Sequence, residues 1–338
     1  DVFIVQYEHM VRFLIHSIAF LCCLSVNAKE HINLQFNDQY SQSSYGGIGL
    51  IQTPTARFSN DGEFGFGVSS EGPYNRLYAK MQFFPWMEAV LRYTEGTFQP
   101  YNPGSHQTWK DKGIDLKIKI LEENTIRPEI AIGLIDVGGT GAYSSEYLVA
   151  SKRFQNIDWS IGIGWGKLAG VDHINNIVGW LDEDRKTRGG YKPRGGTLSL
   201  ERLFSGKTNS IFGGFEYFTP IKNLSLKLEY DTSDYSNVLG SEKVFDQVGD
   251  IFELDSRFNY AINYKVDLGD KDNLDIAVGF VRGNTIYANF SVHSNLNYKG
   301  IPKVTIGAEK IRNSNLPAKS FRELDQKWQT FLTNRIIK

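Results

Sequence analysis

The sequence predicts an all-β fold, a transmembrane antiparallel outer-membrane β-barrel of about 12–14 strands, followed by a short C-terminal amphipathic helix. The first observation is the stretch 74–96, in which apolar and polar residues alternate on both sides of Pro85 and Trp86. Successive strand side chains point to opposite faces, so this stretch predicts a hairpin with one apolar and one charged face. The second observation is that charges lie in the middle of the polar face. The third is that Tyr, Trp and Phe recur at strand ends, where the aromatic girdles of membrane barrels lie.

The same alternation recurs along the chain. It is clear in 62–70, 113–121, 127–136, 157–166, 223–231, 257–265, 274–282 and 284–293, and weaker in 145–154, 196–204 and 209–218. Strands of about ten residues suit a tilted crossing of a bilayer.

The connections between these strands fall into short ones, such as 85–86 and 155–156, and long ones. The long ones are 97–111, 137–144, 167–195 and 232–256. Three predicted strands separate the last two, which would place these loops on opposite sides of the membrane. Either one strand is assigned wrongly, or 232–256 is a long periplasmic loop.

A soluble exported β-sandwich would also alternate, with its apolar face turned inward. In a barrel the apolar face contacts outer-membrane lipid and the polar face lines a lumen. The inner wall then has two interpretations. Its tyrosines and mixed charges form a saccharide path, because aromatic rings stack on sugars and charged groups hydrogen-bond hydroxyls, or they simply fill the lumen. The candidate path residues are Tyr74, Arg76, Tyr78, Lys80, Arg92, Lys117, Lys119, Lys227, Glu229 and Tyr287.

The N-terminus predicts an export signal over 1–28, with residues 1–9 upstream of the true start. A short basic segment at 10–12 precedes an apolar run at 13–24. This run is shorter than the roughly 20 residues that span a bilayer as a helix. Both cysteines, Cys22 and Cys23, fall inside this signal, and Ala19 and Phe20 do not fit a lipoprotein motif. The mature chain is therefore expected to lack disulfides.

We expect four segments in all. After the signal come a polar periplasmic lead-in over 29–44 and the barrel over 45–311. The last segment, 312–338, is expected to be the start of a truncated periplasmic α/β segment. Ser320 and Glu323 there form a capping-box pattern ahead of a helically spaced apolar run.

No pattern predicts an enzyme, a metal or a cofactor. Gly206–Lys207–Thr208 lacks the first glycine of a phosphate loop, because Glu201 stands in that position. His173 and His293 have neither a serine elbow nor metal-ligand spacing, and Asp182–Asp184 is expected to be a solvated turn. The net charge of -1 gives no sign of nucleic-acid binding.

Three stretches together resemble one family. They are GGIGLIQTPTARF at 46–58, the segment 61–95 containing YNRLYAKMQFFPWMEAVLRYTE, and the segment 255–296. They are similar to the YjbH/GfcD family of outer-membrane proteins associated with exopolysaccharide and group 4 capsule production. The resemblance implies a two-barrel protein of about twice this length, of which this chain is the first half. It also implies a periplasmic partner and a small lipoprotein partner, and no catalytic residues.

These observations predict a barrel that assists export or surface assembly of an exopolysaccharide or capsule. The alternatives are a general or solute-specific diffusion porin, a barrel-borne hydrolase or acyltransferase, and a soluble exported sandwich with an adhesive role.

Overall fold

The computed structural model describes residues 40–100, 106–189, 202–235, 253–269, 272–297, 321–323 and 325–336. They belong to two compact units, 1–297 and 298–338. The predicted signal and the cysteines lie outside the described residues.

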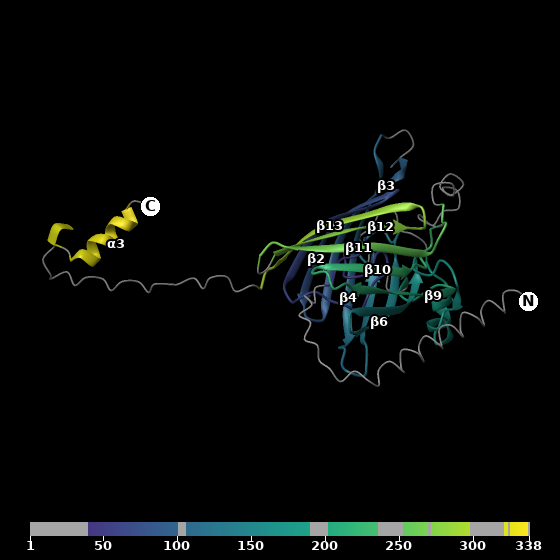
Figure 1. Cartoon of the computed structure of the whole chain (residues 1–338). Coiled ribbons are helices and arrows are strands. Elements are labelled where there is room, and N and C mark those ends of the chain that lie inside the picture. The colour runs from purple at the N-terminus through teal and green to yellow at the C-terminus, as the bar shows by residue number, and fades with distance from the viewer. Residues whose placement is uncertain are drawn as a thin grey trace, which may run out of the picture. The chain divides into compact units, whose positions relative to one another are not determined.

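The first unit is built from antiparallel strands (Figure 1). Their bounds are β1 Glu63–Glu71, β2 Tyr74–Phe84, β3 Met87–Pro100, β4 Thr108–Leu121, β5 Glu129–Ile135, β6 Ser145–Phe154, β7 Ile157–Gly166, β8 Ile174–Asn175, β9 Thr208–Phe218, β10 Leu224–Tyr230, β11 Phe258–Asp267, β12 Asp272–Val281 and β13 Thr285–Asn295. Two short 3-10 helices, η1 Val178–Trp180 and η2 Glu183–Lys186, lie between β8 and β9.

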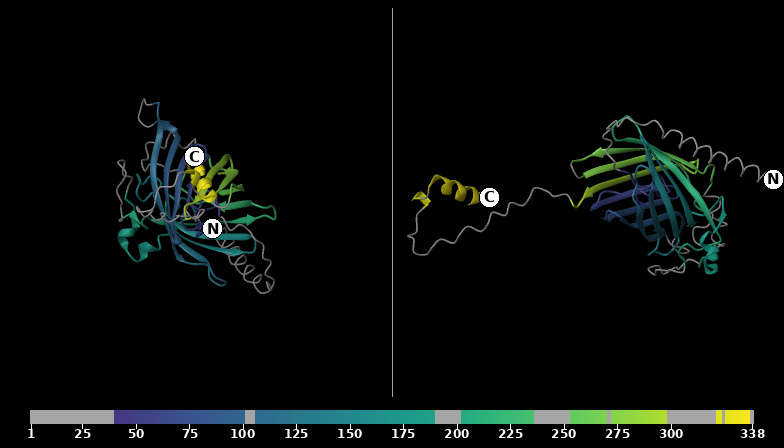
Figure 2. Two further views of the ribbon diagram at one scale, coloured as in Figure 1. Left: turned by 90° about the vertical axis from the view of Figure 1, so that its left-hand side faces the viewer. Right: turned by 90° about the horizontal axis from the view of Figure 1, so that it is seen from below.

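The sheet closes on itself. Each long strand pairs with its neighbours in the chain, β7 pairs with β9, and β13 pairs with β1. The result is a closed barrel of 12 strands, as the alternation predicted, with the two-residue β8 paired to β9 outside that count. Figure 2 shows the same wall from two further sides. Closure leaves no open strand edge, which a bilayer would penalise.

The barrel has its apolar side chains outside and its polar side chains inside. In β10, Leu226 is 40% exposed, whereas its neighbour Lys227 is 3% exposed and Glu229 is fully buried. The strict alternation of β1 follows the same rule, with Phe66 outside and Ser69 inside. This is the reverse of a soluble sandwich and the arrangement of transmembrane barrels.

The weak strand predicted at 196–204 is wrong in its described part, since Arg202–Phe204 form a turn. The remainder of that range lies outside the described residues. Because β7 pairs directly with β9, only β9 and β10 separate the two longest loops, which therefore leave the barrel at the same end. The two explanations left open by the sequence are thus reduced to one: a strand was assigned wrongly.

The two ends of the barrel differ. One end, here called the terminal mouth, holds the start of β1, the end of β13 and connections such as 85–86, 155–156 and 268–271. The other end, the loop mouth, carries 101–107, 136–144, 167–207 and 231–257. The division between short turns and long loops is that of outer-membrane barrels.

Residues 40–58, here called the insert, lie inside the barrel. Ser41, Gln42 and Thr53 are fully buried, and so is Ile51. The expected lead-in over 29–44 is therefore wrong in its described part, because Tyr40 to Ser44 belong to the insert. The barrel strands also end at Asn295, before the expected limit of 311, and 298–311 lie outside the described residues.

The second unit contains η4 Phe321–Glu323 and the helix α3 Gln326–Ile336. Asp325 caps α3 by accepting a hydrogen bond from the Trp328 backbone N–H at 3.0 Å, so the helix begins after the predicted capping box. Trp328 and Phe331 pack edge to face, with ring centroids 5.5 Å apart. Among the described residues, no helix combines the length and apolar character needed to cross a bilayer.

We predict that Leu226→Arg will lower the free energy of unfolding in lipid vesicles by about 2–4 kcal/mol, because it places a charge on the outer face. Ile126→Arg is the control, since Ile126 is 92% exposed in the turn after β4. Urea unfolding followed by tryptophan fluorescence measures both. Equal losses for the two variants would contradict the outward assignment of Leu226.

Candidate functional site

All ten predicted path residues lie on the inner wall. Nine are no more than 3% exposed, and Lys119 has a side chain 21% exposed near the terminal mouth. The structure thus brings them together around one lumen. It also shows what the sequence did not reveal, namely that the insert occupies that lumen.

Glu229 holds the tip of the insert. Its carboxylate accepts hydrogen bonds from three consecutive backbone N–H groups, those of Ile51 at 2.9 Å, Gln52 at 2.8 Å and Thr53 at 3.0 Å. The Thr53 hydroxyl and the Asn259 amide also donate to it, at 2.8 and 2.9 Å. A buried carboxylate is costly unless it is hydrogen-bonded, so the turn of the insert and Glu229 stabilise each other.

Two lysines hold the carbonyl groups of the insert. Lys227 donates to the Gly49 and Leu50 carbonyls at 2.8 and 2.9 Å. On the opposite wall, Lys117 donates to the Ile48 carbonyl at 3.0 Å and pairs with Glu88 at 3.1 Å. Glu88 in turn accepts the Ile48 backbone N–H at 3.2 Å. The wall therefore binds the insert mainly through its backbone.

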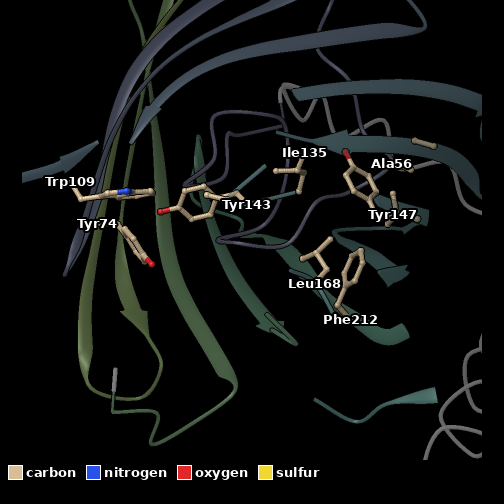
Figure 3. Packing of buried hydrophobic residues seen from close by; sticks show 11 residues of the cluster. Ala56, Tyr74, Trp109, Ile135, Tyr143, Tyr147, Leu168 and Phe212 are labelled. Carbon is tan, nitrogen blue, oxygen red and sulfur yellow. The ribbon is translucent and has the colours of Figure 1, made fainter. Parts of the chain in front are cut away.

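Aromatic contacts fix the part of the insert nearer the loop mouth. The Tyr45 ring lies 4.5 Å from the Arg76 guanidinium and 4.9 Å from that of Arg92, within cation–π range. Tyr45 also meets Tyr143 edge to face, and Tyr143 meets Tyr74 in the same way. Figure 3 shows Tyr143 beside Tyr74 and Trp109, inside the barrel. Arg76 and Arg92 are also paired on the wall with Glu71 and Asp115.

Glycine is required where the insert passes the wall. Gly46 has a φ of 93°, and a Cβ built on it would lie 2.5 Å from the Tyr78 ring. The glycines of 46–49 were visible in the sequence as an unusual stretch. They were the one signal that could have indicated a tightly packed internal segment.

Arg57 fixes the insert at the terminal mouth. Its guanidinium contacts Asp158 at 2.5 Å, Glu123 at 2.6 Å and Glu129 at 2.8 Å. Burial opposes its charge, but the hydrogen bonds and the charge of Asp158 outweigh that effect and hold the pKa of Arg57 above its ordinary value. Sequence reasoning missed this residue because Arg57 lies outside every alternating stretch.

The loop mouth is closed over the insert. Tyr235 donates to Gln52 of the insert and to Asp231. The start of the connection between β7 and β9 contacts the same region, since the Thr232 hydroxyl donates to the Leu168 carbonyl at 2.7 Å. Cavities beside the insert measure about 20–30 Å³. Each has room for about one water molecule, so neither of these cavities admits a sugar among the residues that the structure describes.

His293 lies in an arrangement that resembles a catalytic triad. Its Nε2 is 2.9 Å from the Ser291 hydroxyl, and its Nδ1 is 3.2 Å from Glu63. However, Ser291 is fully buried, Lys80 also pairs with Glu63 at 2.9 Å, and the adjoining cavity measures about 20 Å³. No substrate reaches the serine in this structure, so the network fills the lumen.

The other sequence candidates are not brought together. His173 is exposed in loop 167–207, and Asp182 accepts a hydrogen bond from the Asp184 backbone N–H at the start of η2. The described residues contain no group of three or more His, Cys, Asp or Glu side chains arranged to hold a metal ion.

Asp136 is a buried carboxyl just beyond β5, at the loop mouth. Burial, and then the charge of Asp111, raise the pKa of Asp136 to about 7. Its Oδ2 accepts the Tyr143 backbone N–H at 3.0 Å, and its backbone N–H donates to Asp115 at 2.7 Å. It therefore couples loop 136–144 to the wall beside Tyr45.

We predict that Glu229→Gln will destabilise the chain by about 2–4 kcal/mol, because it replaces an acceptor of buried N–H groups with a group that also donates. Amide hydrogen exchange at residues 51–53 will accelerate. Glu95→Gln is the control, since Glu95 is a partly exposed outward residue paired with Lys110. Unchanged exchange at 51–53 would contradict the role given to Glu229.

We also predict a pH dependence at Asp136. Because its folded pKa is raised from 3.8 to about 7, the folded state binds this proton more tightly than the unfolded chain. Stability will therefore fall as pH rises through this window, by on the order of 2–4 kcal/mol. Asp136→Asn will remove that part of the dependence. Unfolding midpoints measured from pH 4 to 8 compare the two; parallel profiles would refute the assignment.

Comparison with known proteins identifies a family and one curated relative. The family model described as exopolysaccharide biosynthesis protein YbjH matches residues 41–334. The uncharacterized lipoprotein YjbH of Escherichia coli K12 is 36% identical over 261 residues, covering 76% of this chain and 35% of that protein. The chain thus spans about a third of that relative's length.

Solved structures match the chain at much lower similarity. A KdgM porin in complex with disordered oligogalacturonate has a TM-score of 0.35 and 9% identity, covering 69% of this chain and 98% of that one. A NanC porin has a TM-score of 0.34 and 9% identity, covering 69% and 99%. With its family model matched from the insert through α3, this chain belongs to the YjbH family, described as exopolysaccharide biosynthesis proteins.

Proposed function

We propose that this chain is an outer-membrane β-barrel of a Gram-negative bacterium that assists export or surface assembly of an exopolysaccharide or capsule. Family membership supports the exopolysaccharide role, and the apolar outer face supports the membrane location. The terminal mouth then faces the periplasm and the long loops face outward. Its partners are the polysaccharide, outer-membrane lipid, a periplasmic protein and a lipoprotein of the same export system.

The observation that carries the proposal is the chemistry of the inner wall. Tyr78 and Tyr287 lie on it together with hydrogen-bonding charges such as Lys227 and Glu229. Tyrosine rings and paired charges suit a hydroxyl-rich chain, so the ten inner-wall residues are proposed as the saccharide path. No catalytic residue is assigned, because the wall offers positioning groups and no accessible nucleophile among the described residues.

The main alternative is a diffusion porin. A porin holds a water-filled channel open. Here the insert fills the lumen and Tyr235 closes its loop mouth. A lumen that is closed at rest suits a dedicated transport system better than continuous diffusion of solutes.

A complementation experiment tests the proposal. A strain lacking the gene would receive the full-length protein carrying either Tyr287→Ala, on the inner wall, or Tyr260→Ala, on the outer wall. We expect Tyr287→Ala to reduce surface polysaccharide several-fold and Tyr260→Ala to leave it unchanged. Tyr287 lies on β13 and Tyr260 on β11, on either side of β12, but Tyr287 is 1% exposed and Tyr260 is 52% exposed.

Heat-modifiable migration on gels would confirm that both variants fold. Normal surface polysaccharide with a folded Tyr287→Ala protein would contradict the proposed path. Normal polysaccharide in the strain lacking the gene altogether would contradict the exopolysaccharide role itself.

A further inference from the structure

We propose that the insert is a retractable stopper, which leaves the lumen through the terminal mouth and so gives the barrel a closed and an open state. The stopper itself stands on the geometry of this chain. Only the identity of what passes through the open lumen rests on the proposed function.

The path of the insert permits retraction without threading. Its first residue, Tyr40, packs against Phe218 at the end of β9, with ring centroids 6.3 Å apart. Its far end returns to the same mouth, where Arg57 lies over the Tyr40 ring at 5.2 Å. Ser59, the residue directly after the insert, donates its backbone N–H to the Gln82 side chain near the end of β2. Both ends of the loop therefore lie at the terminal mouth, and the loop can withdraw while the strands stay paired.

Many of the polar contacts that hold the insert can be replaced by hydrogen bonds to water. Glu229, Lys227 and Lys117 bind its backbone by hydrogen bonds. An intramolecular hydrogen bond exchanged for one to water changes the free energy little. Withdrawal would turn the polar part of the inner wall into a hydrated channel. It would also expose the apolar side chains of Ile48, Leu50 and Ile51, which are no more than 2% exposed, and this cost favours the closed state at rest.

The insert also fits the lumen imperfectly in its polar contacts. Gln42 is fully buried, yet both the oxygen and the nitrogen of its amide lack hydrogen-bond partners. The hydroxyl of Tyr287, on the wall, lacks a partner within the described part of the protein as well. Polar atoms left unsatisfied on burial favour the state in which they meet water. They lower the stability of the closed state relative to the open one.

Arg57 is the latch. It completes a network at the terminal mouth in which Glu123, Glu129 and Asp158 face Arg57, Lys119 and Lys152. Arg57 alone comes from the insert, so its release leaves the wall charges at a mouth that opens to solvent. The network therefore holds the stopper in the lumen. When the stopper leaves, the ion pairs of Lys119 with Glu129 and of Lys152 with Glu123 remain on the wall.

Single-channel conductance in planar bilayers, with KCl as the probe, tests the stopper. The wild-type chain is expected to be mostly closed with rare openings. Arg57→Gln is expected to raise the open probability about tenfold or more, because it removes one side of a buried ion-pair network. Arg127→Gln is the control, since Arg127 is exposed at the same mouth and donates to the Glu122 carbonyl without touching the insert.

A second variant, in which a short Gly-Ser linker replaces 41–57, is expected to be open continuously. Heat-modifiable migration identifies the folded barrels. If folded Arg57→Gln chains conduct no more often than wild type, or if the folded linker variant stays closed, the insert is a permanent filling and the proposal is overturned. Because the probe is a salt, either result is separate from a failure of the polysaccharide phenotype.

Discussion

The structure depends on one constraint: the charged groups inside the barrel are shielded from bulk water and need hydrogen-bond partners within the protein. Glu229 meets this constraint with three consecutive backbone N–H groups of the insert. Lys227, two residues away from Glu229 on the same strand, meets it with the Gly49 and Leu50 carbonyls of the insert. Without the insert, these groups would need a hydrated lumen. With it, charged groups inside a barrel of 12 strands find hydrogen-bond partners within the protein.

The same constraint explains the reversed amphipathicity of the wall. Outward residues such as Leu226 need no partner inside the chain, whereas inward residues are organised around 40–58. At the loop mouth the insert again supplies a partner, because the Tyr235 hydroxyl donates a hydrogen bond to Gln52 of the insert. The insert thus connects the hairpin of β3 and β4 with β7 and with β10, which lie far apart in the sequence.

Much of the fold could be predicted from the sequence because alternation at period two is local. Strand β10 shows this well, since four apolar positions and their polar neighbours suffice to assign both faces. The segment 196–204 shows the limit, because a short alternating run also occurs in a turn, and only pairing of β7 with β9 excludes it. The ten inner-wall residues were identified by the same rule. However, alternation predicts which face of the sheet a side chain lies on and does not predict which residue it contacts. The contact between Ile51 and Glu229 joins residues 178 positions apart, and no local pattern encodes it.

The most direct measurement is the reactivity of a cysteine placed in the insert. Ser43 is 4% exposed, and the mature chain is expected to contain no other cysteine. A maleimide should label Ser43→Cys in the folded barrel far more slowly than Ile126→Cys in the exposed turn, and at the same rate after denaturation. Equal rates in the folded state would show that the insert does not occupy the lumen, and would contradict the account at its centre.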